Sequence, residues 1–264
     1  MPTDPAIEAM LRRKTIRKYS DQLPAGDVVS TIVRAGQQAP FASQLYSLLL
    51  SRDRAKNPFE APLLFTVCID LHKLELVMAR RKWEVVTNDL LLLLFGAQDA
   101  SLMAQNMVMA GEHLGLGSCF LGAAPYRADI IAQEYKLPPR VFPLVQMTMG
   151  YPAEDPPPRP RYPMSFALFE DEYPEISKDV VAAAMRDMDE GYLAQDYYQG
   201  GAIMIPLEAE RQETFTAETY SWTEHISRKW GQWFPSSQDL LDQFSRRGFS
   251  LCASPEQPAE EPGE

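Results

Sequence analysis

The residues of this chain with the clearest capacity for chemistry are positively charged. Five lysine and arginine side chains fall within seven residues near the amino terminus, at positions 12, 13, 14, 17 and 18. A smaller pair, Arg159 and Arg161, lies in a proline-rich stretch. Arginine holds a phosphate through its planar fork, and lysine holds it as a point charge. We therefore expect these two groups, the first and second basic islands, to meet around one anionic group.

The first basic island also has a simpler interpretation. It follows a short helix predicted to begin at Asp4 and Pro5, a capping acceptor and a residue suited to the first helical position. Cations at the carboxyl end of a helix offset the helix dipole. A solvated basic face would need no ligand, so charge alone leaves both interpretations open.

Other kinds of site find little support in the sequence. Gly115 and Gly117 follow a predicted helix rather than a strand, the reverse of a dinucleotide-binding motif, and no P-loop is present. The three histidines, at 72, 113 and 225, have no metal-type spacing with each other or with cysteine. No Gly-x-Ser-x-Gly nucleophile elbow occurs. We therefore expect no metal site.

The composition narrows the class of partner and the compartment. The chain has 264 residues and a formal net charge of −11, which argues against a nucleic-acid-binding surface. Its three cysteines include no CxxC pair and suit a reducing compartment. The apolar run at 90–95 is flanked by polar residues and is too short to span a membrane. No signal peptide is visible. We expect a cytoplasmic protein that binds neither nucleic acid nor membrane.

Hydrophobic periodicity predicts the elements that would position the basic islands. Strands are expected at 45–51, 63–70, 118–122 and 143–150. Helices are expected after Asp4, from Pro24 to before Pro40, and over 85–114, 126–136, 177–199, 221–232 and 236–247, with an irregular stretch at 200–218. The pattern indicates an α+β fold in which a modest sheet is packed by helices.

Four ordered blocks between residues 7 and 165 carry recognisable motifs. They are Arg13-Lys-Thr-Ile-Arg17-Lys-Tyr19, Ala39-Pro-Phe-Ala-Ser-Gln-Leu45, the helix and glycine strand from Asp99 to Gly122, and Leu144 to Pro163 with its Pro-Arg-Pro-Arg run. In this order and spacing the blocks resemble the FMN-dependent nitroreductase family. Residues 221–227 and 246–249 resemble the larger nitroreductase and flavin reductase subgroup, which carries a C-terminal helical extension.

The resemblance implies a nitroreductase-like α+β fold with a small mixed or antiparallel sheet, which forms a homodimer with FMN at the interface. It implies an FMN-binding core at 1–165 and a helical extension at 166–252 that packs on the core or on the partner subunit. The Pro- and Glu-rich tail at 253–264 is expected to be disordered. The residues implied to contact FMN are Arg13, Lys14, Thr15 and Arg17 at the phosphate, ribityl chain or ring edge, Ala42, Ser43, Gln44, Phe120, Leu121, Gly122 and Ala123 at the ring, and Arg159 and Arg161 at the phosphate end.

Three features depart from the family pattern. Lys14 stands where the family usually has arginine, which removes a bidentate fork. The segment 52–62 is short where related enzymes usually have a helix and a Gly-Asn-Gln-like turn, so we expect a more open pocket or less tightly bound FMN, with Asn57 as the one candidate for the missing amide. Arg211 is a single basic residue in a segment where the subgroup can carry several for the 2′-phosphate of NADPH.

The activity implied by the resemblance is hydride transfer from NADH or NADPH through the flavin to a nitroaromatic, quinone or flavin acceptor, by a ping-pong mechanism. The cofactor performs the redox chemistry, so no catalytic side chain is expected. Two alternatives stay open. One is a flavin-binding protein with weak or lost turnover, and the other is a flavin-modifying or dehalogenating relative of the same fold.

Overall fold

The computed structural model describes residues 4–201, 203–208, 211–232 and 236–251. The chain forms two compact units. The first unit comprises residues 1–156 and 236–264, and the second comprises residues 157–235. The tail at 253–264, expected to be disordered, lies outside the described residues.

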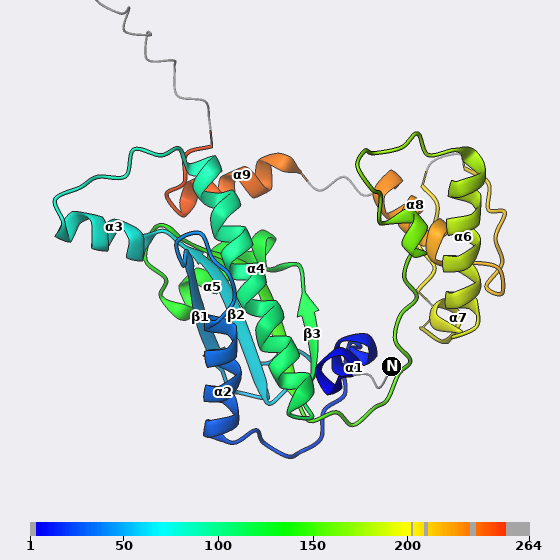
Figure 1. Ribbon diagram of the computed structural model, residues 1–264, viewed down its shortest axis with the longest axis horizontal. Coiled ribbons are helices and arrows are strands. Elements are labelled where there is room, and N and C mark those ends of the chain that lie inside the picture. Colours follow the sequence, from blue (N-terminus) through cyan, green and yellow to red (C-terminus); the bar gives the residue numbers. More distant parts are fainter. Residues whose placement is uncertain (1–3, 202, 209–210, 233–235, 252–264) are drawn as a thin grey trace, which may run out of the picture. The chain divides into compact units, whose positions relative to one another are not determined.

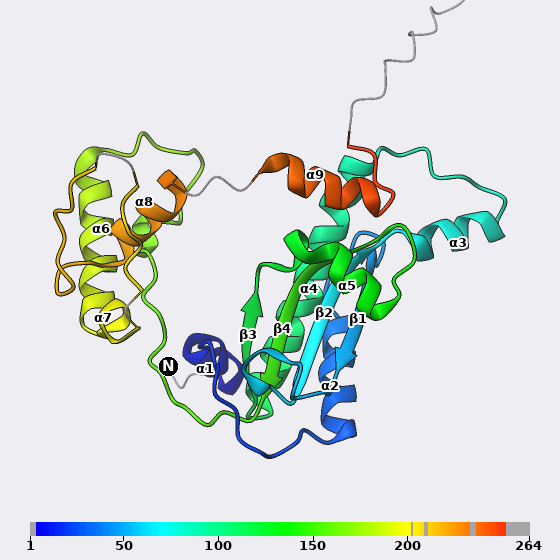
Figure 2. The ribbon, with the colours of Figure 1, turned by 180° about the vertical axis from the view of Figure 1, so that it is seen from behind.

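Four strands form one antiparallel sheet in the first unit (Figures 1 and 2). They are β1 (Tyr46–Ser51), β2 (Leu63–Asp70), β3 (Gly117–Leu121) and β4 (Val141–Gly150), in the order β1-β2-β4-β3. Every residue of β2 is buried, which accounts for its mostly apolar sequence. The predicted α+β fold, with its small antiparallel sheet and four strand positions, is confirmed.

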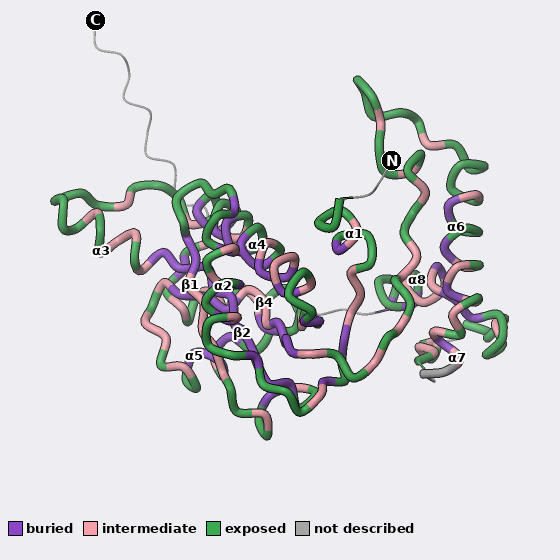
Figure 3. Tube along the Cα trace, turned by 60° about the horizontal axis from the view of Figure 1, so that its bottom comes forward, coloured by how far each residue is buried: buried purple, intermediate pink, exposed green. Residues whose placement is uncertain are grey.

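Helices cover both faces of this sheet. α2 (Gly26–Gln37) and α4 (Asp89–His113) lie over one face and α5 (Ala128–Tyr135) over the other, as the opposite views in Figures 1 and 2 show. The close approach of α2 to α4 depends on Gly36, where a Cβ atom would lie 2.6 Å from Met107 Cγ. Buried residues run along β2 and α4 (Figure 3) and form the main core. No helix in the described ranges is long and apolar enough to cross a membrane.

Two outer helices show what the sequence could and could not predict. α1 (Pro5–Arg12) begins as expected, with the Asp4 carboxylate accepting from the Ala6 amide at 2.8 Å. α3 (His72–Arg80) was not predicted, and it contains no buried residue. Because it has no buried stripe, it leaves little helical periodicity in the sequence.

The second unit is built around α6 (Lys178–Leu193), α7 (Tyr197–Gly201) and α8 (Trp222–Gln232). The helix predicted over 177–199 is interrupted between α6 and α7, where Asp196 adopts a left-handed φ of 46°. The buried side chains of this unit that pack together are largely aromatic and include Met188, Tyr192, Tyr198 and Tyr220.

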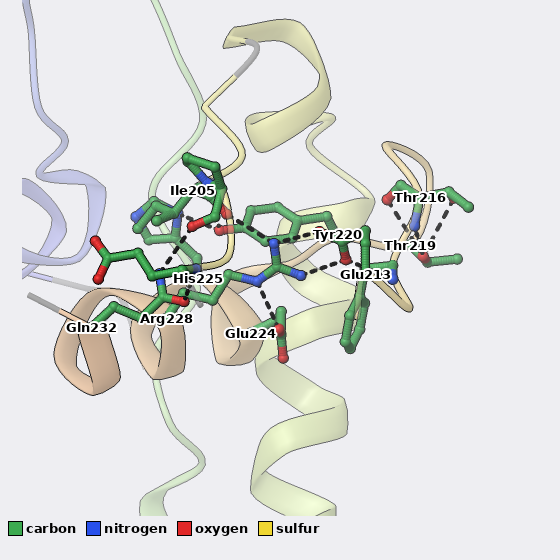
Figure 4. A network of polar contacts seen from close by, with 12 residues as sticks. Ile205, Glu213, Thr216, Thr219, Tyr220, Glu224, His225, Arg228 and Gln232 are labelled. Atoms are coloured by element: carbon green, nitrogen blue, oxygen red, sulfur yellow. Dashed lines mark hydrogen bonds and ion pairs between the residues drawn. The ribbon is translucent and has the colours of Figure 1, made fainter. Parts of the chain in front are cut away.

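A buried guanidinium holds the irregular chain of the second unit against α8 (Figure 4). Arg228 forms ion pairs with Glu213 at 2.6 Å and Glu224 at 2.8 Å, and donates to the Ile205 carbonyl at 2.8 Å. The bond with Arg228 lowers the pKa of Glu213 to about 2. The stretch before α8 therefore has fixed partners although it is neither helix nor strand.

The last helix, α9 (Ser237–Arg246), belongs to the first unit. Its Phe244 ring stacks on Phe142, with 3.9 Å between centroids, and Phe249 meets Phe142 edge-on at 6.2 Å. The compact units therefore divide after residue 156 and again after residue 235. The division predicted from the sequence, into 1–165 and 166–252, stays a prediction.

One side chain joins three separate parts of the first unit. The Arg140 guanidinium bonds to Glu75 of α3 at 2.6 Å, to Asp89 of α4 at 2.7 Å and to the Gly248 carbonyl at 2.9 Å. Burial would raise the pKa of Asp89, but the bonds from Arg140 and the Ser250 amide outweigh it and hold that pKa below its usual value. This ion-pair cluster ties the segment after α9 to the start of α4.

We predict that Arg140→Met lowers the free energy of unfolding by about 2 kcal/mol, because it leaves two partly buried carboxylates without their partner. Urea unfolding monitored by tryptophan fluorescence would measure the change. The difference from wild type should shrink at low pH, since the stabilisation is present above the unfolded pKa of Asp89 and is lost as pH falls through its lower folded value.

The matched control is Arg246→Met, which removes an exposed ion pair with Asp129. It should cost less than about 1 kcal/mol. Equal effects of the two substitutions would contradict the role given to Arg140.

Candidate functional site

The first basic island lies along the edge of the sheet beside β3. Thr15 forms a parallel bridge with Ser118, and the Ile16 amide donates to the Ser118 carbonyl at 2.9 Å. Ile16 is buried over Gly117, where a Cβ atom would lie 2.3 Å from Ile16 Cγ1. The absence of a side chain at Gly117 thus allows this approach. The structure therefore brings Arg13, Lys14, Thr15 and Arg17 next to the strand that carries Phe120 and Leu121.

Acidic side chains accompany these cations. Lys14 forms an ion pair with Asp155, and the backbone amides of Arg17 and Lys18 donate to Glu154 Oε1 at 2.5 and 3.0 Å. Burial raises the pKa of Glu112, and the neighbouring charges of Arg13 and Lys14 oppose that rise.

The guanidinium groups of Arg13 and Arg17 have no ion-pair partner within the described part of the chain. Arg17 lies beside the Cys119 thiol, whose pKa is raised by burial and lowered by that positive charge. These two side chains are therefore the members of the predicted phosphate site that are most available to an anion.

The loop with the predicted ring-lining residues is fixed by one buried carboxylate. Asp99 of α4 is 1% exposed and accepts from the amides of Ala42 at 2.6 Å, Ser43 at 3.1 Å and Leu45 at 2.9 Å. Between them, Gln44 adopts a left-handed φ of 54°. Ala42, Ser43 and Gln44 are exposed, so the backbone is held firmly while these side chains point outward.

Sequence reasoning missed this role of Asp99, although a signal for it existed. Asp99 is a carboxylate on the buried side of a largely apolar helix, and a buried charge must have hydrogen-bond partners. In the structure the backbone amides of the loop before β1 are those partners.

The end of β3 opens toward an apolar pocket. Phe120 is 40% exposed, Gly122 and Ala123 are exposed, and a Cβ atom at Gly122 would meet nothing within 4 Å. The pocket has a volume of about 560 Å³, within the range of small-molecule sites. It is lined by Ser101, Leu102, Ala104 and Gln105 of α4, by Phe120, and by Leu144 and Val145 of β4.

The second basic island belongs to the second unit. The Arg159 guanidinium lies 3.7 Å from the centre of the Tyr197 ring and donates to Gln195 Oε1 at 2.9 Å. Arg161 Nη1 donates to the carbonyls of Arg159 and Pro160 at 3.1 and 3.0 Å. Because the two islands belong to different units, their meeting around one phosphate stays a prediction.

The short segment at 52–62 contains a single turn of 3₁₀ helix at Pro58–Glu60 and no α-helix. Asn57 is buried, and its amide donates to the carbonyls of Ala61 at 2.9 Å and Ser51 at 3.4 Å. Both donors of Asn57 therefore hold its own loop. Asn57 does not supply the amide that related enzymes direct at the flavin.

No three His, Cys, Asp or Glu side chains in the described ranges group together as metal ligands. Cys68 and Cys119 are buried and unpaired, and Cys252 lies outside the described residues.

We predict that Asp99→Asn releases the loop before β1. The amide of asparagine replaces one acceptor oxygen by a donor, so at least one of the three backbone N–H groups loses its partner, at a cost of about 3 kcal/mol. Hydrogen exchange would detect faster exchange at Ala42, Ser43 and Leu45. Asp27→Asn, which changes an exposed carboxylate that accepts one amide, is the control. Unchanged protection of the loop in Asp99→Asn would contradict the anchoring role.

Comparisons with known proteins agree with this fold. The nitroreductase family model matches residues 50–151. The chain is 27% identical over 261 residues to "FMN reductase (NADPH)" of Bacillus subtilis, covering 92% of this chain and 98% of that protein. It is 25% identical over 205 residues to "Oxygen-insensitive NADPH nitroreductase" of Salmonella typhimurium, covering 72% and 84%.

Among solved structures, NfrA1 nitroreductase from B. subtilis aligns with a TM-score of 0.76 at 24% identity, covering 92% of this chain and 98% of that one. NfrA2 of B. megaterium aligns with a TM-score of 0.78 at 21% identity, covering 94% and 98%. These similarities extend over nearly the whole length of proteins of similar size, and they confirm the resemblance identified from the sequence motifs. Residues 50–151 carry a domain that matches the nitroreductase family model, and over most of its length the chain is similar to proteins named as FMN and NADPH reductases.

Proposed function

We propose that this protein is an FMN-dependent oxidoreductase that uses NADH or NADPH to reduce a small acceptor. One observation carries the proposal: the Arg13–Arg17 segment bridges β3 at Ser118, and Phe120 of the same strand lines an apolar pocket. Cations suited to a phosphate thus adjoin an apolar surface suited to a flat ring. The relatives named as FMN and NADPH reductases support the same conclusion.

The described residues fit such a cofactor in three ways. The unpaired guanidinium groups of Arg13 and Arg17 provide the charge for a phosphate, with Lys14 and Thr15 beside them. The open space at Gly122 allows a ring to approach the backbone, because no Cβ atom stands in the way. The anchored loop at Ala42, Ser43 and Gln44 offers a rigid edge for that ring. Arg159 and Arg161 would add charge at the phosphate end.

When bound, FMN supplies the hydride transfer between the nicotinamide and the acceptor. The chain's own groups bind and orient the reactants and exclude water, and no side chain is needed as a nucleophile or general base. Because one pocket would serve donor and acceptor in turn, we expect ping-pong kinetics. Nitroaromatics, quinones and free flavin are the acceptor classes that the site would accept.

The exposed face of α4 supports a homodimer with FMN at its interface. Along this helix Leu90, Leu94 and Leu102 are all exposed, and Leu94 and Leu102 are among the residues that line an apolar groove of about 480 Å³. An apolar helix face of this kind is typical of a surface covered by another subunit. The buried free thiols of Cys68 and Cys119 are compatible with the reducing cytoplasm that we propose as the compartment.

The first test of the function is spectroscopic. The purified protein should be yellow or become so with added FMN, and NADH or NADPH should bleach the flavin absorbance under nitrogen. A protein that binds FMN but is not bleached would instead favour the flavin-binding alternative, which the absence of an α-helix at 52–62 makes worth testing. A protein that does not bind added FMN would contradict both the oxidoreductase proposal and the flavin-binding alternative.

We predict that Arg17→Ala weakens FMN binding about 10- to 100-fold, the effect of losing one charge-assisted bond to a phosphate. Titration of flavin fluorescence would measure the affinity. Arg12→Ala is the matched control, since Arg12 is in the same basic island and is exposed like Arg17, but forms an ion pair with Glu8 at 4.0 Å. Equal affinities for the Arg17 variant and wild type would remove Arg17 from the phosphate site.

We predict that Leu94→Glu converts a dimer to a monomer, because it places a charge on the apolar face of α4. Light scattering coupled to size-exclusion chromatography would give the mass. Leu76→Glu is the control, since Leu76 is similarly exposed on α3, at 58% against 55% for Leu94. A dimer that survives Leu94→Glu would place the interface elsewhere.

A further inference from the structure

The ion pair between Lys14 and Asp155 occupies one of the cations assigned to the phosphate. The Lys14 side chain is 24% exposed, whereas that of Asp155 is 89% exposed. Within the described part of the chain, each of these charged groups has no other hydrogen-bond or ion-pair partner. Asp155 is therefore free to turn into solvent if another anion takes its place.

The backbone keeps this acid close to the first basic island. After β4 the chain runs beside residues 18–20, where the Ser20 amide donates to the Tyr151 carbonyl and the Ala153 amide donates to the Lys18 carbonyl, both at 2.9 Å. Glu154 accepts from the amides of Arg17 and Lys18. These bonds fix the chain up to the residue before Asp155, so the local concentration of its carboxylate around Lys14 is high.

Two other acidic residues near Lys14, Glu154 and Glu112, differ from Asp155 in their contacts. Glu154 is committed to backbone amides, and its loss would disturb the local fold. Glu112 is partly buried, and its carboxylate makes no ion pair with Lys14. Asp155 is exposed, and the only partner of its side chain within the described residues is Lys14, one of the cations assigned to the phosphate.

We propose that Asp155 is an internal counter-ion that competes with the anionic group of the cofactor for Lys14, and so sets the affinity of the site for anions. The inference rests on the proposed function, because it assumes that FMN places its phosphate at Lys14. The ligand-free protein holds Lys14 neutralised, and FMN binding displaces the Asp155 carboxylate.

The size of the effect follows from the exposure of the pair. Exposed ion pairs are worth up to about 1 kcal/mol, so removing the competitor should raise FMN affinity about two- to fivefold. Riboflavin has the same ring and ribityl chain but no phosphate, and its affinity should not change.

The experiment measures the affinities of wild type and Asp155→Asn for FMN and for riboflavin by fluorescence titration. Asp53→Asn is the matched control, because Asp53 also forms an exposed ion pair with a lysine, Lys56, at 3.1 Å. The expected result is tighter FMN binding in Asp155→Asn alone, with unchanged riboflavin binding. A gain for both ligands, or for neither, would overturn the inference.

A second comparison uses Lys14→Met as the background. If Asp155 acts through Lys14, its substitution should give a smaller gain in FMN affinity when Lys14 is absent, and an equal gain in both backgrounds overturns the inference. A wild-type protein that binds no FMN would overturn the proposed function and this inference together. Wild-type binding with an unaffected Asp155→Asn variant would overturn the inference alone.

Discussion

The buried carboxylate of Asp99 is the interaction on which the candidate site depends most. A charge that is 1% exposed is costly unless it is fully hydrogen-bonded, and here three backbone amides of one loop provide the bonds. The loop in turn needs Asp99, because it has no regular secondary structure in which those backbone N–H groups could find acceptors. The longest helix and the loop before β1 therefore position each other.

A second constraint places the cations. The chain after α1 can reach the sheet only because Gly117 leaves room for Ile16, and this contact brings the first basic island to β3. Acidic residues of the chain after β4 then moderate its charge. In the resulting site Lys14 is already paired with an acid, whereas Arg13 and Arg17 remain available to a ligand.

The sequence predicted the strands and most helices because burial leaves periodic patterns. It failed at α3, where nothing is buried, and at Asp196, which interrupts a helix by backbone conformation. For the site, the motif resemblance predicted which segments come together, and the structure shows one of these contacts, the first basic island beside β3. The ion pair of Lys14 and the internal bonds of Asn57 and Arg159 depend on residues far apart in sequence or on loop geometry, so no local pattern revealed them.

The return of α9 to the first unit has a consequence for biosynthesis. Phe142 is translated about 100 residues before its ring partners Phe244 and Phe249. During synthesis this apolar surface of the first unit therefore stays uncovered while the second unit is produced. Nascent chains with such exposed surface are prone to aggregate, and the first unit completes this part of its core only after Phe244 and Phe249 have left the ribosome.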